Sequence, residues 1–331
     1  MIEHLAAFAE TRARRALALA GLPAGVAATR AESVTNEVYL TGSHVIRVNR
    51  KPTGRLQREA ILCRSLPARR WTPRVVAQGH ETGLDYLIAL RRPGSTLARW
   101  WPMMNEEHRR AATRQLAHAL SQLHRFPCPP DVPPLERNPQ LFDLGSSSPL
   151  LAMFAGVERL RARGDIDPAL LRDAEELLVR TGDAVLDPGP HHLVHGDLTF
   201  ENVLWDGSTL TGLIDFEWSR CAPADLDLDV LLRFCAYPAA HLPAHLEDQA
   251  FPADFAQVPR WMAEVYPQLF SHPRLLDRLR LYAVGFEVRE LLTTPRIPSV
   301  ASLRPLHPYR RLRQLLDGLS HLDRFREERL L

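Results

Sequence analysis

The sequence predicts an α+β protein with two lobes, a small N-terminal lobe built on an antiparallel sheet and a larger, mainly helical C-terminal lobe. Its length of 331 residues suits about two domains, because one domain takes up roughly 150 residues. Short β-type runs crowd the first 92 residues, whereas most of the later chain repeats its apolar residues with the helical period. We therefore predict a boundary between residues 1–92 and residues 93–331.

The N-terminal lobe is expected to begin with a helix over residues 2–20, which Gly21 ends. Short apolar runs then alternate with turn residues, a pattern typical of a β-meander. The expected strands lie at 27–32, 37–41 and 44–50, and a further pair brackets the turn at 79–83. A helix over 55–67 separates the two groups of strands, and residues 91–94 form a linker to the second lobe.

The C-terminal lobe is expected to be helical except around residues 191–219, where two apolar, strand-like runs enclose a polar loop. A proline-rich connector at 127–134 interrupts the helices. Helices are expected at 105–126, 149–164, 167–184 and, together with loops, throughout the chain after residue 225. The last helix is amphipathic, with its apolar side formed by Leu312, Leu315, Leu316, Leu319 and Leu322.

The composition is that of a globular protein and excludes several functional classes. Hydrophobic residues make up 45% of the chain, charged residues make up 24%, and the formal net charge is +2. This charge is too small for a dedicated binder of nucleic acid or of an anionic membrane. No apolar run is long enough to span a bilayer. We therefore expect a cytoplasmic protein, monomeric or homodimeric, without nucleic-acid or membrane partners.

The four cysteines of the chain are Cys63, Cys128, Cys221 and Cys235. They form no CxxC pair and have no histidine at the spacing of metal ligands. In a reducing cytoplasm the sequence therefore predicts four free thiols.

Acidic and amide side chains gather in the strand-like part of the C-terminal lobe. Asp197 and Asn202 lie five residues apart after one apolar run, and Asp215 follows a second apolar run. Phosphoryl transfer requires a carboxylate that accepts the proton of a hydroxyl, together with oxygen ligands for Mg²⁺. The spacing therefore indicates a phosphoryl-transfer site, and the structural alternative is that these residues cap strands and loops.

The two motifs resemble those of the aminoglycoside phosphotransferase and choline kinase family. The family's loop H-G-D-L-x-x-x-N and strand I-D-[FWY]-E are matched by His195, Gly196, Asp197, Leu198, Asn202, Ile214, Asp215, Phe216 and Glu217. The resemblance implies a bilobal, protein-kinase-like fold that binds ATP or GTP together with Mg²⁺. It implies Asp197 as the catalytic base and Asn202 and Asp215 as the metal ligands. His195 would pack the loop, and Glu217 would contact a second metal or make a structural hydrogen bond.

In the N-terminal lobe, strand alternation places Val45, Arg47, Asn49 and Lys51 on one face. Lys51 is the only lysine of the chain, and its position suggests a solvated charge at the strand end. The resemblance implies that Arg47 grips the nucleotide phosphates and is braced by Glu59 of the following helix. The alternative is an ordinary surface pair.

The rest of the expected nucleotide site also comes from the resemblance. Val45 lies on the same strand face as Arg47, and Asn36 belongs to the turn Ser33-Val34-Thr35-Asn36, which would cover the phosphates. The run that ends in Leu90 and Arg92 resembles the family's hinge, where the Leu90 carbonyl and the Arg92 amide would contact adenine through the backbone.

Two further residues of the C-terminal lobe match family positions. Asp225 corresponds to a residue that braces the catalytic loop, whereas Asp227 or Asp229 would cap the helix that begins there. His124, at the end of the first helix of this lobe, is expected to be buried and hydrogen-bonded.

The expected acceptor region, about 135–190 and 236–331, carries no motif. From Arg274 to Leu331 the chain has twelve arginines and seven acids, which suits a neutral or anionic hydroxyl compound, a peptide or a sugar better than a polycationic aminoglycoside. We predict an ATP- or GTP-dependent phosphotransferase acting on a small-molecule hydroxyl of the antibiotic, sugar or amino-alcohol class. The alternatives are a kinase of peptide serine or threonine hydroxyls in peptide maturation and a nucleotide-binding pseudokinase that acts as a partner module.

Overall fold

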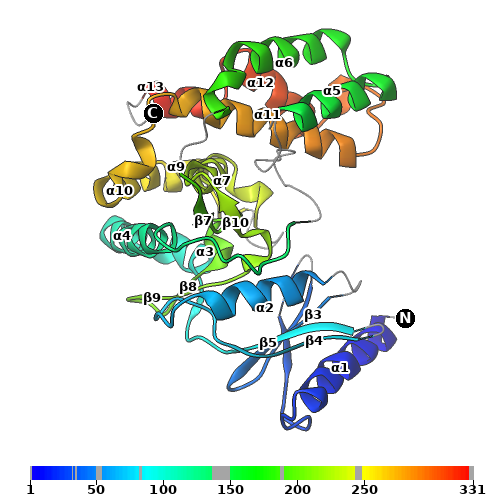
Figure 1. The fold of residues 1–331 in the computed structure, drawn as a ribbon, viewed down its shortest axis with the longest axis vertical. Coiled ribbons are helices and arrows are strands. Elements are labelled where there is room, and N and C mark those ends of the chain that lie inside the picture. The colour runs from blue at the N-terminus through cyan, green and yellow to red at the C-terminus, as the bar shows by residue number, and fades with distance from the viewer. Residues whose placement is uncertain are drawn as a thin grey trace. The chain divides into compact units, whose positions relative to one another are not determined.

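The computed structural model describes residues 2–31, 33, 36–49, 54–81, 84–135, 150–186, 190–242 and 248–327, with the backbone alone for residues 2–10. The predicted α+β class is confirmed. The chain divides into two compact units (Figure 1). The first comprises 1–104, 129–133 and 200–219, and the second comprises 105–128, 134–199 and 220–331. The lobe boundary that the sequence suggests after residue 92 remains a prediction.

The first unit is built on a five-stranded sheet with the strand order β1-β2-β3-β5-β4. Its strands are β1 (Thr29–Ala31), β2 (Asn36–Leu40), β3 (His44–Asn49), β4 (Val75–Glu81) and β5 (Leu84–Leu90). Every neighbouring pair is antiparallel, as the short alternating runs of the sequence predict. Of the residues that the sequence singles out here, Val34, Thr35 and Lys51 lie outside the described residues.

Helices α1 (Ile2–Leu19) and α2 (Arg55–Ser65) cover the two faces of this sheet. Strand alternation separates the faces: Ile46, Val48, Tyr86 and Ile88 pack in one core with Ala13, Ala16 and Leu17 of α1. On the other face, Leu87 packs against Leu56 and Ala60 of α2. Arg47 is the strand neighbour of Ile46 and pairs with Leu87, so its side chain points to the α2 face.

A second, three-stranded sheet in the first unit has the order β6-β8-β9. It consists of β6 (Ser95–Thr96), β8 (Val203–Trp205) and β9 (Leu210–Leu213). The short helices next to these strands in the chain are α3 (Leu97–Trp100), η1 (Trp101–Met103), η3 (Phe200–Asn202) and η4 (Phe216–Trp218). At the entry to β6, Gly94 has φ +93°, and a Cβ there would lie 2.0 Å from the Trp205 carbonyl oxygen. Only glycine fits this close approach. The sheet therefore joins residues 200–219 to the same unit as Arg47.

The second unit is mainly helical, with one short antiparallel pair of strands, β7 (His192–Val194) and β10 (Arg220–Ala222). Its α-helices are α4 (Glu106–Leu123), α5 (Leu151–Arg163), α6 (Pro168–Thr181), α7 (Asp225–Ala236), α9 (Pro252–Phe255), α10 (Val258–Val265), α11 (Leu275–Thr293), α12 (Pro308–Leu316) and α13 (His321–Glu327). Its 3₁₀ turns are η2 (Gly182–Val185), η5 (Pro238–Ala240), η6 (Pro267–Phe270) and η7 (Val300–Ser302).

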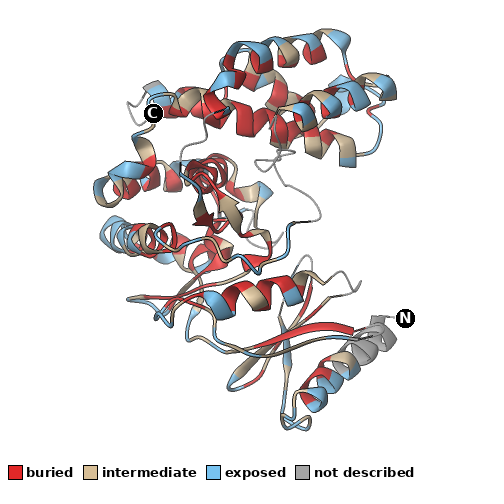
Figure 2. Cartoon of the chain, viewed as in Figure 1, coloured by how far each residue is buried: buried red, intermediate tan, exposed pale blue. Residues whose placement is uncertain are grey.

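Helix α7 forms the centre of the second unit, and every one of its residues is buried (Figure 2). Helix α11 packs against α7, α5 and α12. Helices α4 and α6 instead carry exposed outer faces, which is the ordinary amphipathic arrangement of a surface helix. No described helix combines the length and the apolar content that a bilayer crossing needs.

Two sequence predictions about this unit are wrong. Cys128 and Cys221 form a disulfide, whereas Cys63 and Cys235 are buried free thiols. The two bonded cysteines are 93 residues apart, Cys221 on β10 and Cys128 beyond the end of α4, so local spacing could not show the bond. The expected final helix is divided into α12 and α13, because Gly318 adopts φ +70° after Leu316.

Candidate active site

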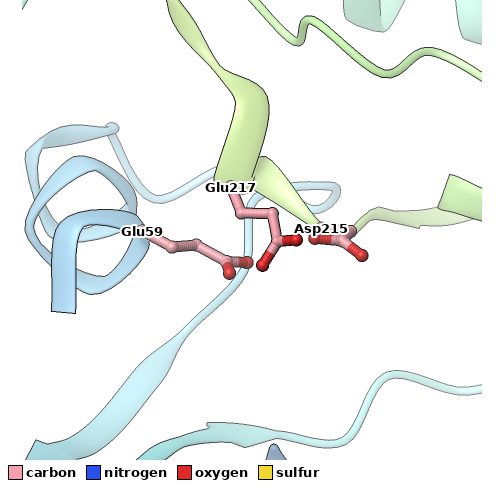
Figure 3. Close-up of side chains that lie close together, drawn as sticks. All are labelled: Glu59, Asp215 and Glu217. Atoms are coloured by element: carbon pink, nitrogen blue, oxygen red, sulfur yellow. The ribbon is translucent and has the colours of Figure 1, made fainter. Parts of the chain in front are cut away.

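A cluster of three carboxylates around one arginine lies in the first unit. Arg47 Nη1 lies 2.6 Å from both carboxylate oxygens of Glu59, which comes from α2. Arg47 Nη2 lies 2.9 Å from Asp215 Oδ1 and 3.6 Å from Glu217 Oε2. One oxygen from each of Glu59, Asp215 and Glu217 lies within 4.8 Å of the others, and Figure 3 shows the three side chains converging. The surface-pair alternative for Arg47 and Glu59 is wrong, because the two side chains are only 11% and 3% exposed.

The charges of this cluster are not balanced. Burial acts to lower the pKa of Arg47, but Asp215, Glu59 and Glu217 outweigh it and raise that pKa, so the guanidinium stays charged. Burial raises the pKa of Glu59 to about 7. Arg47 acts to lower this pKa, whereas the charges of Asp215 and Glu217 act to raise it further. Burial and Asp215 likewise raise the pKa of Glu217. One cation against three carboxylates leaves an excess of negative charge, which a divalent cation would relieve.

Asn202 and Asp215 lie at the same end of one strand pair. Val203 of β8 pairs with Leu213 of β9, and the Ile214 amide donates to the Asn202 carbonyl over 2.9 Å. The spacing of thirteen residues between Asn202 and Asp215 therefore closes into a short hairpin. An amide oxygen and a carboxylate are hard oxygen donors, and the Asp215 side chain is 29% exposed, so this donor set fits Mg²⁺.

Asn36 and Glu217 complete the cluster on the sheet side. Asn36 begins β2, is 3% exposed, and its Nδ2 donates to Glu217 Oε2 over 3.4 Å. Of the two roles considered for Glu217, the structure shows the hydrogen bond. Asn36 therefore faces the carboxylates rather than a solvent-exposed turn.

The residues expected to contact the nucleotide base lie at the end of the β3-β5 strand pair that leads into the linker. Val45 of β3 pairs with Ala89 of β5, and Leu90 ends β5 with its amide donating to the Arg74 carbonyl over 2.9 Å. The Arg92 guanidinium donates to the Thr72 carbonyl over 2.6 Å and so anchors the linker. The adenine contacts of the Leu90 carbonyl and the Arg92 amide remain predictions.

The Asp197 loop follows β7 in the second unit and is held through its backbone. The Asp227 carboxylate accepts hydrogen bonds from the His195 amide over 2.8 Å and the Gly196 amide over 2.7 Å. The His195 ring is fully buried, and its Nδ1 accepts the Asp197 amide over 3.4 Å, so His195 packs the loop as expected. Asp197 itself is half-buried and follows directly after this fixed backbone.

Asp227 is held in turn by the end of α4. His124 Nε2 lies 3.0 Å from Asp227 Oδ2, and His124 Nδ1 lies 3.1 Å from the Tyr266 hydroxyl. His124 is thus buried and hydrogen-bonded, as predicted. Burial acts to raise the pKa of Asp227, but the hydrogen bonds and charges of the histidines and the Gly196 amide lower it below its ordinary value. Asp227 therefore stays ionised at neutral pH.

The prediction that Asp225 braces the Asp197 loop is wrong, because the carboxylate that holds this loop is that of Asp227. The Asp225 carboxylate instead pairs with the Arg278 guanidinium and accepts from the Tyr282 hydroxyl over 3.0 Å. Both partners come from α11, so Asp225 ties α7 to α11. Asp229 pairs with Arg233 one turn along the same helix, and neither Asp227 nor Asp229 caps it.

Comparison with known proteins identifies the class of the chain. The phosphotransferase enzyme family matches residues 27–265, and the chain belongs to that family. An aminoglycoside 3'-phosphotransferase of Streptomyces fradiae is 33% identical over 170 residues, which cover 48% of this chain and 56% of that protein. The match thus spans just over half the length of this curated relative.

Solved structures with the same fold are also aminoglycoside phosphotransferases. The ADP-bound APH(2'')-Ib superposes with a TM-score of 0.62 at 16% identity, covering 90% of this chain and 95% of that one. A thermostable mutant of APH(4)-Ia in ternary complex with ADP and hygromycin B superposes with a TM-score of 0.54 at 16% identity, covering 96% of each chain. These likenesses confirm the bilobal α+β fold that the sequence predicts.

Proposed function

We propose that this protein transfers the terminal phosphoryl group of ATP or GTP, bound with Mg²⁺, to a hydroxyl group of a small molecule. The observation that carries the proposal is the Arg47 cluster, in which a buried arginine joins Glu59 to Asp215. Membership of the phosphotransferase enzyme family and the ADP of the neighbouring structures support it.

Arg47 is the residue that grips the nucleotide phosphates. Its planar guanidinium can donate to two oxygens at once, which suits a phosphate better than a point charge does. Glu59 holds the other edge of the guanidinium and fixes its direction. Asn36, Val45, Leu90 and Arg92 form the remaining contacts to the nucleotide in this proposal.

Asn202 and Asp215 would hold the Mg²⁺, which would supply positive charge for the phosphate oxygens. The protein's own part is to present one amide oxygen and one carboxylate at the end of the β8-β9 hairpin. Glu217 adds a negative charge behind them and keeps Asn36 in place.

Asp197 is the base that orients the acceptor hydroxyl and takes its proton. Its backbone is fixed by Asp227 and His195, so its carboxylate reaches the acceptor from a preorganised loop. Positioning and electrostatics, with no covalent enzyme intermediate, account for the rate.

The acceptor belongs to the antibiotic, sugar or amino-alcohol class. The arginine surplus of the C-terminal region is smaller than the sequence count suggests, because Arg274, Arg278 and Arg313 pair with carboxylates outside the region. The ion-paired arginines there are Arg274, Arg278, Arg280, Arg289, Arg311 and Arg313. The relative from Streptomyces fradiae is by name an enzyme for aminoglycosides, which supports testing these compounds first.

The test is a panel of hydroxyl acceptors incubated with Mg-ATP or Mg-GTP, with the Asp197→Asn variant as the blank. The panel contains aminoglycosides, macrolides, sugars, nucleosides, choline and serine or threonine peptides. We expect phosphate incorporation into one class of small molecule that depends on Asp197. Labelling of peptides alone would replace the small-molecule proposal, and nucleotide binding without any labelled acceptor would favour a pseudokinase.

A further inference from the structure

Arg58 is a buried arginine on α2 whose place the nucleotide site does not explain. It is 7% exposed, whereas Arg64 on the same helix is exposed. Among the described residues it contacts no carboxylate in an ion pair. Burial lowers its pKa to about 10, although the charge of the adjacent Glu59 acts in the opposite direction. Burying a guanidinium is costly unless its N–H donors are hydrogen-bonded. The partners of the Arg58 donors therefore show what this residue holds in place.

Each nitrogen of the Arg58 guanidinium donates to a main-chain carbonyl. Nε donates to Pro133 over 2.7 Å, Nη1 donates to Glu217 over 3.3 Å, and Nη2 donates to Ser219 over 2.5 Å. Two of the three acceptors belong to the segment directly after Asp215. The fixed fork of the guanidinium therefore sets the path of that segment beside α2.

The same segment begins with an unfavourable backbone conformation. Asp215 has φ +63°, and among the described residues it is the only one other than glycine with a positive φ. The Glu59 carboxylate accepts the Phe216 amide over 3.1 Å. Two adjacent residues of α2 thus hold the segment from both sides, Glu59 through an amide and Arg58 through two carbonyls.

From this geometry we infer that Arg58 is a positioning residue that keeps Asp215 in the orientation needed to bind the metal. Because its guanidinium is bonded to main-chain carbonyls, Arg58 acts on Asp215 through the backbone of residues 216–219. The inference rests on the proposed function, because it takes Asp215 as a ligand of the Mg²⁺ that accompanies the nucleotide.

The test compares Arg58→Ala and Arg58→Lys with the wild type, and uses Arg64→Ala on the exposed side of α2 as the matched control. ATP affinity is titrated with Mg²⁺ and with EDTA. Loss of a residue that orients a metal ligand typically costs about 10–100-fold in metal affinity or activity. For Arg58→Ala we expect that loss in the Mg²⁺-dependent part of ATP binding and an unchanged ATP affinity in EDTA. Binding should recover in part when guanidinium chloride is added to Arg58→Ala at millimolar concentration, and Arg58→Lys should lose less than Arg58→Ala.

Hydrogen exchange of the peptide covering residues 214–220 gives a second readout that needs no nucleotide. Exchange should be faster in Arg58→Ala and unchanged in Arg64→Ala. Folded Arg58 variants with the Mg²⁺ dependence and the exchange rate of the wild type would overturn the inference. If Arg58→Ala does not fold, Arg58→Lys decides by the same two measurements. If Mg²⁺ has no effect on nucleotide binding by the wild type, the proposed function fails, and the exchange rates alone still show whether Arg58 holds the segment.

Discussion

The carboxylate cluster of the first unit and the Asp197 loop of the second unit are held in opposite ways. In the cluster, Glu59, Asp215 and Glu217 compete for the single guanidinium of Arg47. In the loop, the one carboxylate of Asp227 accepts two backbone amides and contacts the His124 ring. The cluster has three carboxylates for one guanidinium, whereas in the loop the Asp227 carboxylate is fully paired with hydrogen-bond partners.

This difference separates the two tasks of the proposed reaction. An excess of buried negative charge is costly in the free protein and becomes favourable only when a cation arrives, so the cluster is suited to binding. The loop is complete without a ligand, so it is suited to presenting Asp197 in a constant position. Changes in the loop should therefore act on turnover and stability, and changes in the cluster should act on binding of the metal-nucleotide complex.

The largest effect is expected for Asp197→Asn. The variant keeps the size of the side chain but cannot accept the proton of the acceptor hydroxyl. We expect turnover to fall by at least ~10²-fold while nucleotide affinity stays at the wild-type value. Steady-state kinetics with the acceptor found in the panel, together with nucleotide titration, measure the two quantities. Turnover at the wild-type level would remove Asp197 from the mechanism.

Asp215→Asn should weaken binding of the metal-nucleotide complex, in contrast to Asp197→Asn, which should slow turnover. Asparagine tolerates the left-handed conformation of this position, so the backbone is preserved. We expect affinity for Mg-ATP to fall by at least about 10–100-fold, which is the range for losing a residue that only supports a metal ligand. The stability of the free protein should not fall, because one of three crowded negative charges is removed. Calorimetric titration and urea unfolding measure both, and unchanged Mg-ATP affinity would argue against the ligand role.

Asp227→Asn tests whether this carboxylate holds the Asp197 loop, and its expected effect is smaller than those of the two variants above. The amide group of asparagine has only one acceptor atom, so one of the two backbone amides that Asp227 now holds loses its partner. Leaving a buried donor unsatisfied costs about 1–3 kcal/mol, which we expect as a loss in the free energy of unfolding. Asp131→Asn in the exposed connector is the control and should leave stability unchanged. Equal stability of the two variants would show that Asp227 does not hold the loop.

Much of the cluster could be predicted because its geometry follows from local rules. Strand alternation alone places Arg47 on the face opposite Ile46 and Val48, and the helix after β3 supplies Glu59 to that face. The motifs around Asp197 and Asp215 indicated their chemistry by residue type and spacing. These features follow from the local sequence, whereas the contact of Arg47 with Asp215 joins segments that are 168 residues apart.

The residues that the sequence did not reveal act through contacts between distant segments. Asp225, Asp227 and Asp229 occupy alternate positions of α7, and only the rotation of this helix decides which carboxylate meets the His195 amide. Because α7 is buried on all sides, it has no apolar stripe from which that rotation could be read. Arg58 was missed for a related reason, since its acceptors are main-chain carbonyls 75 to 161 residues away.

The smallest expected effect is a pH dependence that belongs to the cluster and not to the loop. Burial raises the pKa of Glu59 to about 7, above the ordinary value of 4.5. Protonated Glu59 therefore stabilises the free protein. This stabilisation is complete at pH values below the pKa that Glu59 has in the unfolded chain, and it is lost as the pH rises through about 7. Binding of Mg-ATP needs ionised Glu59 to hold Arg47, so its affinity should rise over the same window, by about threefold from roughly pH 6.5 to 7.5. The measurement is the ratio of affinities of the wild type and Glu59→Gln across this range, because the nucleotide's own titration is common to both. A constant ratio would contradict the prediction, because no ionisation of Glu59 would then be linked to nucleotide binding in this range.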